Sequence, residues 1–309
     1  MKIDIYSHIL PKNYLAAFKK KNIDVSHSIE AGVPGLIDID FRLRLMDRYP
    51  DVLQVLTFSL PAPESFVSAS DAIELARIAN DELAEVVMKY PGKFIAAVAC
   101  LPLNDIDASL IEMDRAISQL RLKGIQLFGR SKGDQLSDPK FKPLFQKMAN
   151  YNLPIWIHPC SDGQPMEPML NWPYITATAM SQIVAAGIFN DYPDIKIITH
   201  HCGGVVPFLG GRIKWMFPGA FKADDPSRKW NEHFHKFYCD TATLGYTPAL
   251  ICGYDYFGAD HMLFGTDTPL PSHGFTFETI DSIHRMNISD ADKEKIYFRN
   301  ALKLLNIII

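Results

Sequence analysis

The sequence of 309 residues predicts an α/β fold in which eight parallel strands close into a barrel, a (β/α)8 TIM barrel. Short apolar runs rich in Ile and Val alternate with longer segments of helical period, and these runs number eight. A chain of this length commonly forms such a barrel as one domain. A doubly wound open sheet is the alternative, disfavoured because no Gly-rich phosphate loop follows any of the runs.

The expected strands follow one another at spacings that leave room for a helix between most of them. In chain order they cover residues 3–5, 52–56, 94–99, 124–127, 154–157, 195–198, 237–240 and 262–265. Helices are expected at 71–90, 105–120, 142–150 and 290–305. Ser70 or Asp71 is the expected cap of the first helix, which ends before Pro91 and Gly92.

Two segments of the expected single domain, residues 1–309, are predicted to be insertions. Residues 12–40 show weak periodicity, and residues 216–232 have the composition of a polar loop. Long connections after barrel strands usually lie over the active-site face, so we expect both segments there.

Composition excludes several classes of function. The formal net charge is −4 and no basic run is present, so a nucleic-acid partner has no electrostatic support. We expect no membrane partner, because no apolar run is long enough to cross a bilayer and the first residues do not resemble a signal peptide. The five cysteines are odd in number and widely spaced, which favours free thiols and a cytoplasmic location.

The polar residues that follow the apolar runs carry the chemistry. His8, His158, His201 and Asp267 each stand just after a different expected strand. Singly, each histidine is better explained as a hydrogen-bonded structural residue and the aspartate as a turn residue. Together they would meet at the carboxyl ends of the strands, where barrels carry their active sites. Imidazole and carboxylate are the ligands that zinc and similar divalent ions need.

Four motifs also resemble a known family. They are the opening Met1-Lys-Ile-Asp-Ile-x-x-His8-Ile-Leu-Pro11, Ile157-His158-Pro159, His201-x-Gly203-Gly204 and Gly265-Thr266-Asp267-x-Pro269. In order and spacing they resemble the amidohydrolase-related family that includes aminocarboxymuconate semialdehyde decarboxylase and the resorcylate decarboxylases. The resemblance runs nearly end to end and includes Asn300-Ala301-x-x-Leu304-Leu305.

The resemblance implies a role for each of these residues. His8, His158 and Asp267 would hold a divalent metal, zinc first and manganese as the alternative. His201 would be the acid–base residue, and Asp267 would also orient a water molecule. His200 precedes the motif, and strand alternation predicts that it points away from the pocket when His201 points in, in a structural role.

The sequence departs from the family pattern at two places. Tyr6 stands where the family has histidine or glutamate, and a neutral phenol is a poor ligand. Tyr6 therefore either fills the barrel beside a weakened site or hydrogen-bonds the substrate or a water. Residues 28–37 lack the arginine that grips the substrate in the semialdehyde decarboxylase, and Arg42 and Arg44 are expected on a helix surface. Arg130 is a candidate for meeting a substrate carboxylate, with a salt bridge as an equal alternative.

The leading hypothesis is a metal-dependent decarboxylase of a small aromatic or unsaturated carboxylic acid, with a homodimer as a candidate assembly. Only the resemblance favours decarboxylation. The same residues would serve a metal-dependent hydrolase of an amide, lactone or C–C bond. A degenerate, non-catalytic barrel is a third hypothesis, supported mainly by Tyr6.

Overall fold

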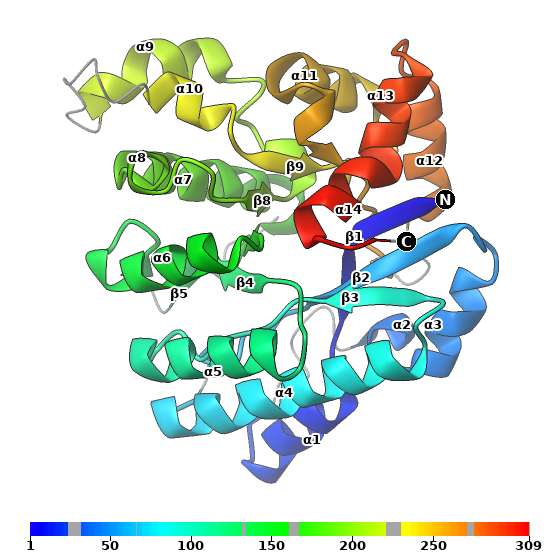
Figure 1. The fold of residues 1–309 in the computed structure, drawn as a ribbon, viewed down its shortest axis with the longest axis vertical. Coiled ribbons are helices and arrows are strands. Elements are labelled where there is room, and N and C mark those ends of the chain that lie inside the picture. The colour runs from blue at the N-terminus through cyan, green and yellow to red at the C-terminus, as the bar shows by residue number, and fades with distance from the viewer. Residues whose placement is uncertain are drawn as a thin grey trace.

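The strands of the barrel follow the chain in the predicted order (Figure 1). The computed structural model describes residues 1–23, 32–65, 67–131, 134–160, 167–220, 230–270 and 275–308. The barrel strands in these ranges are β1 (Lys2–Ile9), β2 (Val52–Phe58), β3 (Phe94–Ala97), β4 (Ile125–Phe128), β7 (Ile155–His158), β8 (Ile197–Thr199), β9 (Tyr238–Asp240) and β10 (Met262–Leu263). Each predicted apolar run overlaps one of them, so the strand predictions are confirmed.

Two parallel sheets join at both edges. One has the order β1-β2-β3 and the other the order β10-β9-β8-β7-β4. A bridge between Ser7 and Thr268 joins β1 to the segment after β10, and a bridge between Ala99 and Ile125 joins the segment after β3 to β4. The predicted TIM barrel is therefore confirmed, and the open doubly wound sheet is excluded.

Helices follow the strands and cover the outside of the barrel (Figure 1). They are α1 (Lys12–Lys20), α2 (Pro34–Ile37), α3 (Ile39–Met46), α4 (Ala69–Lys89), α5 (Ile106–Ser118), α6 (Lys142–Tyr151), α7 (Trp172–Ala185), α8 (Ile188–Asp191), α9 (Gly210–Ala220), α10 (Trp230–Phe234), α11 (Thr247–Phe257), α12 (Thr276–His284), α13 (Asp290–Glu294) and α14 (Asn300–Leu305). A small antiparallel pair, β5 (Arg130–Ser131) and β6 (Asp134–Gln135), follows β4.

Side-chain caps fix where two long helices begin. The hydroxyl of Ser68 accepts a hydrogen bond of 3.2 Å from the backbone N–H of Asp71, so the cap of α4 is Ser68 and the expectation of Ser70 or Asp71 was wrong. Asp105 caps α5 in the same way. The helix predicted at 290–305 contains a π-helical turn, Lys295–Arg299, between α13 and α14.

The two predicted insertions are partly helical. α1 carries Tyr14 and Phe18 into the main hydrophobic core, so the start of the 12–40 segment is part of the packed structure. α9 continues to Ala220, so the loop predicted at 216–232 is helical at its start. Residues 24–31 and 221–229, within these two segments, lie outside the described residues.

The buried side chains form two cores. The smaller one fills the barrel with residues from strands all around it, among them Ile3, Val55, Trp156, Ile198 and Leu263. The larger one lies between the strands and the surrounding helices. The five cysteines are free thiols, as predicted. Among the described residues, no helix is both long and apolar enough to span a bilayer.

Candidate metal centre

The structure brings together the four residues predicted to carry the chemistry. Nε2 of His8, at the end of β1, lies 3.3 Å from Nε2 of His158, at the end of β7. The same His8 nitrogen lies 3.1 Å from Oδ1 of Asp267. Oδ2 of Asp267 lies 3.7 Å from Nε2 of His201. Three imidazoles and one carboxylate thus meet at the carboxyl ends of the barrel strands.

An irregularity in β1 aims His8 at this cluster. The pairing of β1 with β2 shifts register between Asp4 and Ser7. Ile3, Ile5 and Tyr6 all belong to the core inside the barrel, so strict alternation is broken at this point. The bulge therefore puts both Tyr6 and His8 on the inner side of the strand.

His158 presents an unprotonated Nε2 to the site. Its Nδ1–H donates a short hydrogen bond to the carbonyl oxygen of Pro159, which leaves the lone pair on Nε2. Burial, reinforced by His8 and His200, holds the pKa of His158 well below its usual value. A neutral imidazole held in this way is the form that binds a metal.

Asp267 and His201 form a charged pair. Burial would raise the pKa of Asp267, but His201 and His8 outweigh it, so this pKa lies below its usual value. Burial would lower the pKa of His201, but the hydrogen bond and charge of Asp267 outweigh it and raise this pKa. The pair therefore favours a carboxylate beside a protonated imidazole.

The His-x-Gly-Gly motif makes a tight turn after β8. His201 and Cys202 have positive φ angles of 53° and 56°, which end the strand geometry. Gly204 has φ of 62°, and a Cβ there would lie 2.2 Å from the carbonyl oxygen of Pro173 at the start of α7. Only glycine fits this close approach.

The structure corrects the expectation for His200. Its side chain is fully buried and its ring stacks on that of Tyr6, with centroids 3.6 Å apart and planes 14° apart. It does not point away from the site, because the left-handed turn at His201 removes the alternation on which the prediction rested. Nδ1 of His200 shares a hydrogen bond of 2.8 Å with Oδ2 of Asp240.

Sequence reasoning missed two buried residues that hold the ligand-bearing strands. Asp4 accepts hydrogen bonds from the backbone N–H of Thr266 at 3.0 Å and from its hydroxyl at 2.6 Å, tying β1 to the segment that carries Asp267. Arg42 was expected on a surface, but it is 1% exposed and donates to the carbonyl oxygen of His8 and to Gln54. A charged residue inside an apolar run was the available signal for Asp4.

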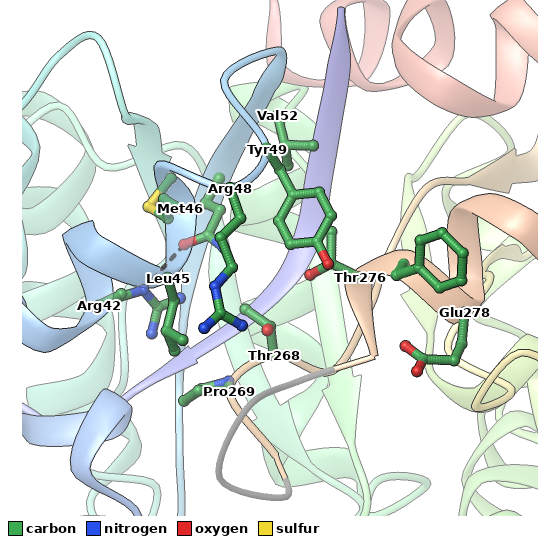
Figure 2. Close-up of a pocket in the computed structure, with 12 residues that line it drawn as sticks. Arg42, Leu45, Met46, Arg48, Tyr49, Val52, Thr268, Pro269, Thr276 and Glu278 are labelled. Atoms are coloured by element: carbon green, nitrogen blue, oxygen red, sulfur yellow. Dashed lines mark hydrogen bonds between the residues drawn. The ribbon is translucent and has the colours of Figure 1, made fainter.

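Arg130 stays a candidate for meeting a substrate carboxylate. Its backbone belongs to β5, and its side chain lies outside the described part of the structure. A pocket of about 220 Å³ lies between α3 and α12 and is lined by Arg42, Arg48, Thr268 and Glu278 among others (Figure 2). None of the four clustered residues lines this pocket, so it is separate from the predicted site.

The donor set fits a divalent ion. Oδ1 of Asp267 is buried and lacks a hydrogen-bond partner among the described residues, and Nε2 of His8 lies 3.1 Å from it. Two neutral imidazoles and a carboxylate are ligands that zinc and manganese both accept. Within the described ranges, no three or more His, Cys, Asp or Glu side chains already form a metal-holding group.

Known proteins resemble this chain over most of its length. Gamma-resorcylate decarboxylase of Rhizobium sp. (strain MTP-10005) is 31% identical, with 88% of each chain covered. 2-Amino-3-carboxymuconate-6-semialdehyde decarboxylase of Dictyostelium discoideum is 28% identical, covering 99% of this chain and 92% of that protein. The structure of dihydroxybenzoic acid decarboxylase from Polaromonas sp. JS666, with bound manganese and 2-nitroresorcinol, superposes with a TM-score of 0.82 at 26% identity, covering 99% and 96%.

The family model for amidohydrolases matches residues 3–307. The match takes in β1 with His8, the turn with His201 and the segment with Asp267, so it spans every part of the cluster described above. This chain is an enzyme of the amidohydrolase family, built as a TIM barrel.

Proposed function

We propose that this enzyme is a metal-dependent, non-oxidative decarboxylase of a small aromatic or unsaturated carboxylic acid. The observation that carries the proposal is the His201–Asp267 pair, 3.7 Å apart, beside the converging Nε2 atoms of His8 and His158. The relatives named for decarboxylation support the reaction type.

His8, His158 and Asp267 are the proposed metal ligands. The manganese in the Polaromonas structure favours a divalent ion and makes manganese as good a candidate as zinc. When bound, the ion supplies Lewis acidity that draws electron density from a substrate oxygen and orients the acid.

His201 and Asp267 would carry out the proton transfer that decarboxylation requires. His201, with its raised pKa, would donate a proton to the carbon that loses its carboxylate. The electron pair of the broken C–C bond would stay on that carbon and form the new C–H bond, while the carboxylate leaves as carbon dioxide. Asp267 would keep His201 protonated and oriented, and water would return the proton.

The position of the Trp172 ring next to His201 and His158 favours an aromatic substrate. The ring of Trp172 lies 6.4 Å from that of His201, nearly parallel at 26°, and 6.1 Å from that of His158. Trp172 is 8% exposed, so its ring could cover one side of a planar acid next to the proposed proton donor.

The test is release of carbon dioxide from a panel of acids by protein loaded with manganese or with zinc. The panel includes 2,6-dihydroxybenzoate, 6-methylsalicylate and non-hydroxylated benzoate as a control. We expect carbon dioxide and the decarboxylated arene in equal amounts from at least one hydroxylated acid. Turnover of amides or lactones with no carbon dioxide from any acid would instead favour the hydrolase alternative.

A further inference from the structure

Tyr6 leaves the proposed metal centre one ligand short. It stands at the position where the resemblance expects histidine or glutamate, and it is fully buried. Its ring lies 4.5 Å from that of His8 and 3.6 Å from that of His200, measured between centroids. A phenol oxygen is a poorer metal ligand than imidazole or carboxylate, the groups that zinc and similar divalent ions select. Only His8, His158 and Asp267 then remain as ligands.

His200 has the features of a metal-binding imidazole. It is fully buried, and its Nδ1 is held by the Asp240 carboxylate at 2.8 Å. Its Nε2 is buried and has no hydrogen-bond partner among the described residues. Proteins commonly orient a ligating histidine by holding its other nitrogen with a carboxylate. Tyr6, stacked on the ring, fixes the plane in which the Nε2 lone pair points.

Two of the ring spacings suit a shared ion. Two imidazoles bound to one metal through bonds of about 2.0–2.1 Å have ring centroids about 4.5–6.4 Å apart, depending on the bond angle. The rings of His8 and His158 are 5.0 Å apart, and those of His158 and His200 are 5.6 Å apart. Both distances fall within this range, so His158 has two neighbouring rings at a suitable spacing.

We propose that His200 is a fourth protein ligand, binding the metal through Nε2 in place of the ligand lost at Tyr6. The inference rests on the metal centre of the proposed function but not on the reaction catalysed there. In this proposal Tyr6 does not bind the metal. Its ring stacks on the imidazole of His200, which supplies the fourth ligand instead.

Metal affinity, measured by chelator competition with Mn²⁺ and Co²⁺, tests the proposal without any substrate. We expect His200→Ala to bind at least about 10–100-fold more weakly than the wild type, the loss seen even for residues that only support a ligand. Tyr6→His combined with His200→Ala restores a nearby imidazole, so its affinity should return to within about tenfold of the wild type. The visible spectrum of the Co²⁺ protein should change in His200→Ala and change back in the double variant.

Controls separate ligation from folding. His200→Gln keeps most of the side-chain volume and should lose affinity as His200→Ala does, while circular dichroism and thermal melting of metal-free protein report the fold. Unchanged affinity in folded His200→Ala or His200→Gln would overturn the proposal, as would a loss that Tyr6→His fails to restore. A wild-type protein that binds neither ion would contradict the metal centre itself, which is a separate failure.

Discussion

At the residue scale, Asp267 divides its two oxygens between two functions. Oδ1 faces His8 at 3.1 Å, on the side of the proposed metal, and Oδ2 faces His201 at 3.7 Å, on the side of the proposed proton donor. Removing Asp267 should therefore affect both functions, whereas removing His201 should affect only the second.

This division predicts opposite results for two variants. Asp267→Ala should lose the bound ion, because a charged ligand disappears from a buried site. His201→Asn should keep the ion but lose about 10²–10⁴-fold in decarboxylation rate, the usual contribution of a general acid. Metal analysis of the purified proteins, together with carbon dioxide release, measures both effects. Loss of metal from His201→Asn would make His201 a ligand and contradict its proposed role.

The sequence predicted the positions of these residues better than their directions. His8, His158, His201 and Asp267 could be found because each follows an apolar run, and parallel strands bring such ends together. The direction of His200 could not be found from alternation, since the φ angles of 53° and 56° at His201 and Cys202 arise from the turn that packs against α7 and α11.

At the element scale, eight strands were predictable because each is a nearly continuous apolar run, as expected for strands buried on both faces. The bulge between Asp4 and Ser7 was not, because it depends on the register with β2. Arg42 is expected on the exposed surface of α3, but it is buried and donates to the carbonyl oxygen of His8. Short connecting helices show too few turns for periodicity to be read reliably.

The turn after β8 gives a prediction at this scale. Gly204→Ala should destabilise the protein by about 2–5 kcal/mol, because it combines a left-handed backbone with a Cβ contact that the backbone of Pro173 cannot relieve. Gly211 in α9 is the matched control: a Cβ there meets no atom within 4 Å, so Gly211→Ala should be neutral or stabilise by up to about 1 kcal/mol. Urea unfolding of the metal-free proteins measures both. Equal stability of the two variants would mean that the turn relaxes away from α7.

At the scale of the whole molecule, closure of the barrel depends on joining the first strand to the last. The alternation of apolar runs and helices predicted a closed barrel, but it did not predict the contacts that close it. Ile5 N–H donates to Phe264 O at 2.9 Å, and His8 N–H donates to Thr268 O at 2.7 Å. Next to these backbone contacts, the carboxylate of Asp4 accepts two hydrogen bonds from Thr266. These contacts join residues more than 250 positions apart, so no local pattern in the sequence encodes them.

Asp4 should make the stability of the closed barrel depend on pH. Burial raises its pKa from 3.8 to about 6, although hydrogen bonds from Thr266, Tyr6 and Ser7 oppose the shift. Because the folded state holds this proton more tightly than the unfolded state, the contribution of Asp4 to stability is greatest below about pH 3.8. It should fall by about 3 kcal/mol as pH rises to 6 and stay constant above that.

Asp4→Asn cannot ionise, and its amide can donate to the two hydroxyls that the carboxylate accepts from. We therefore expect the stability of wild type relative to Asp4→Asn to decrease between pH 4 and pH 6.5, measured by urea unfolding of metal-free protein. A difference that is constant over this range, or that grows with pH, would mean that Asp4 is ionised in the folded barrel throughout.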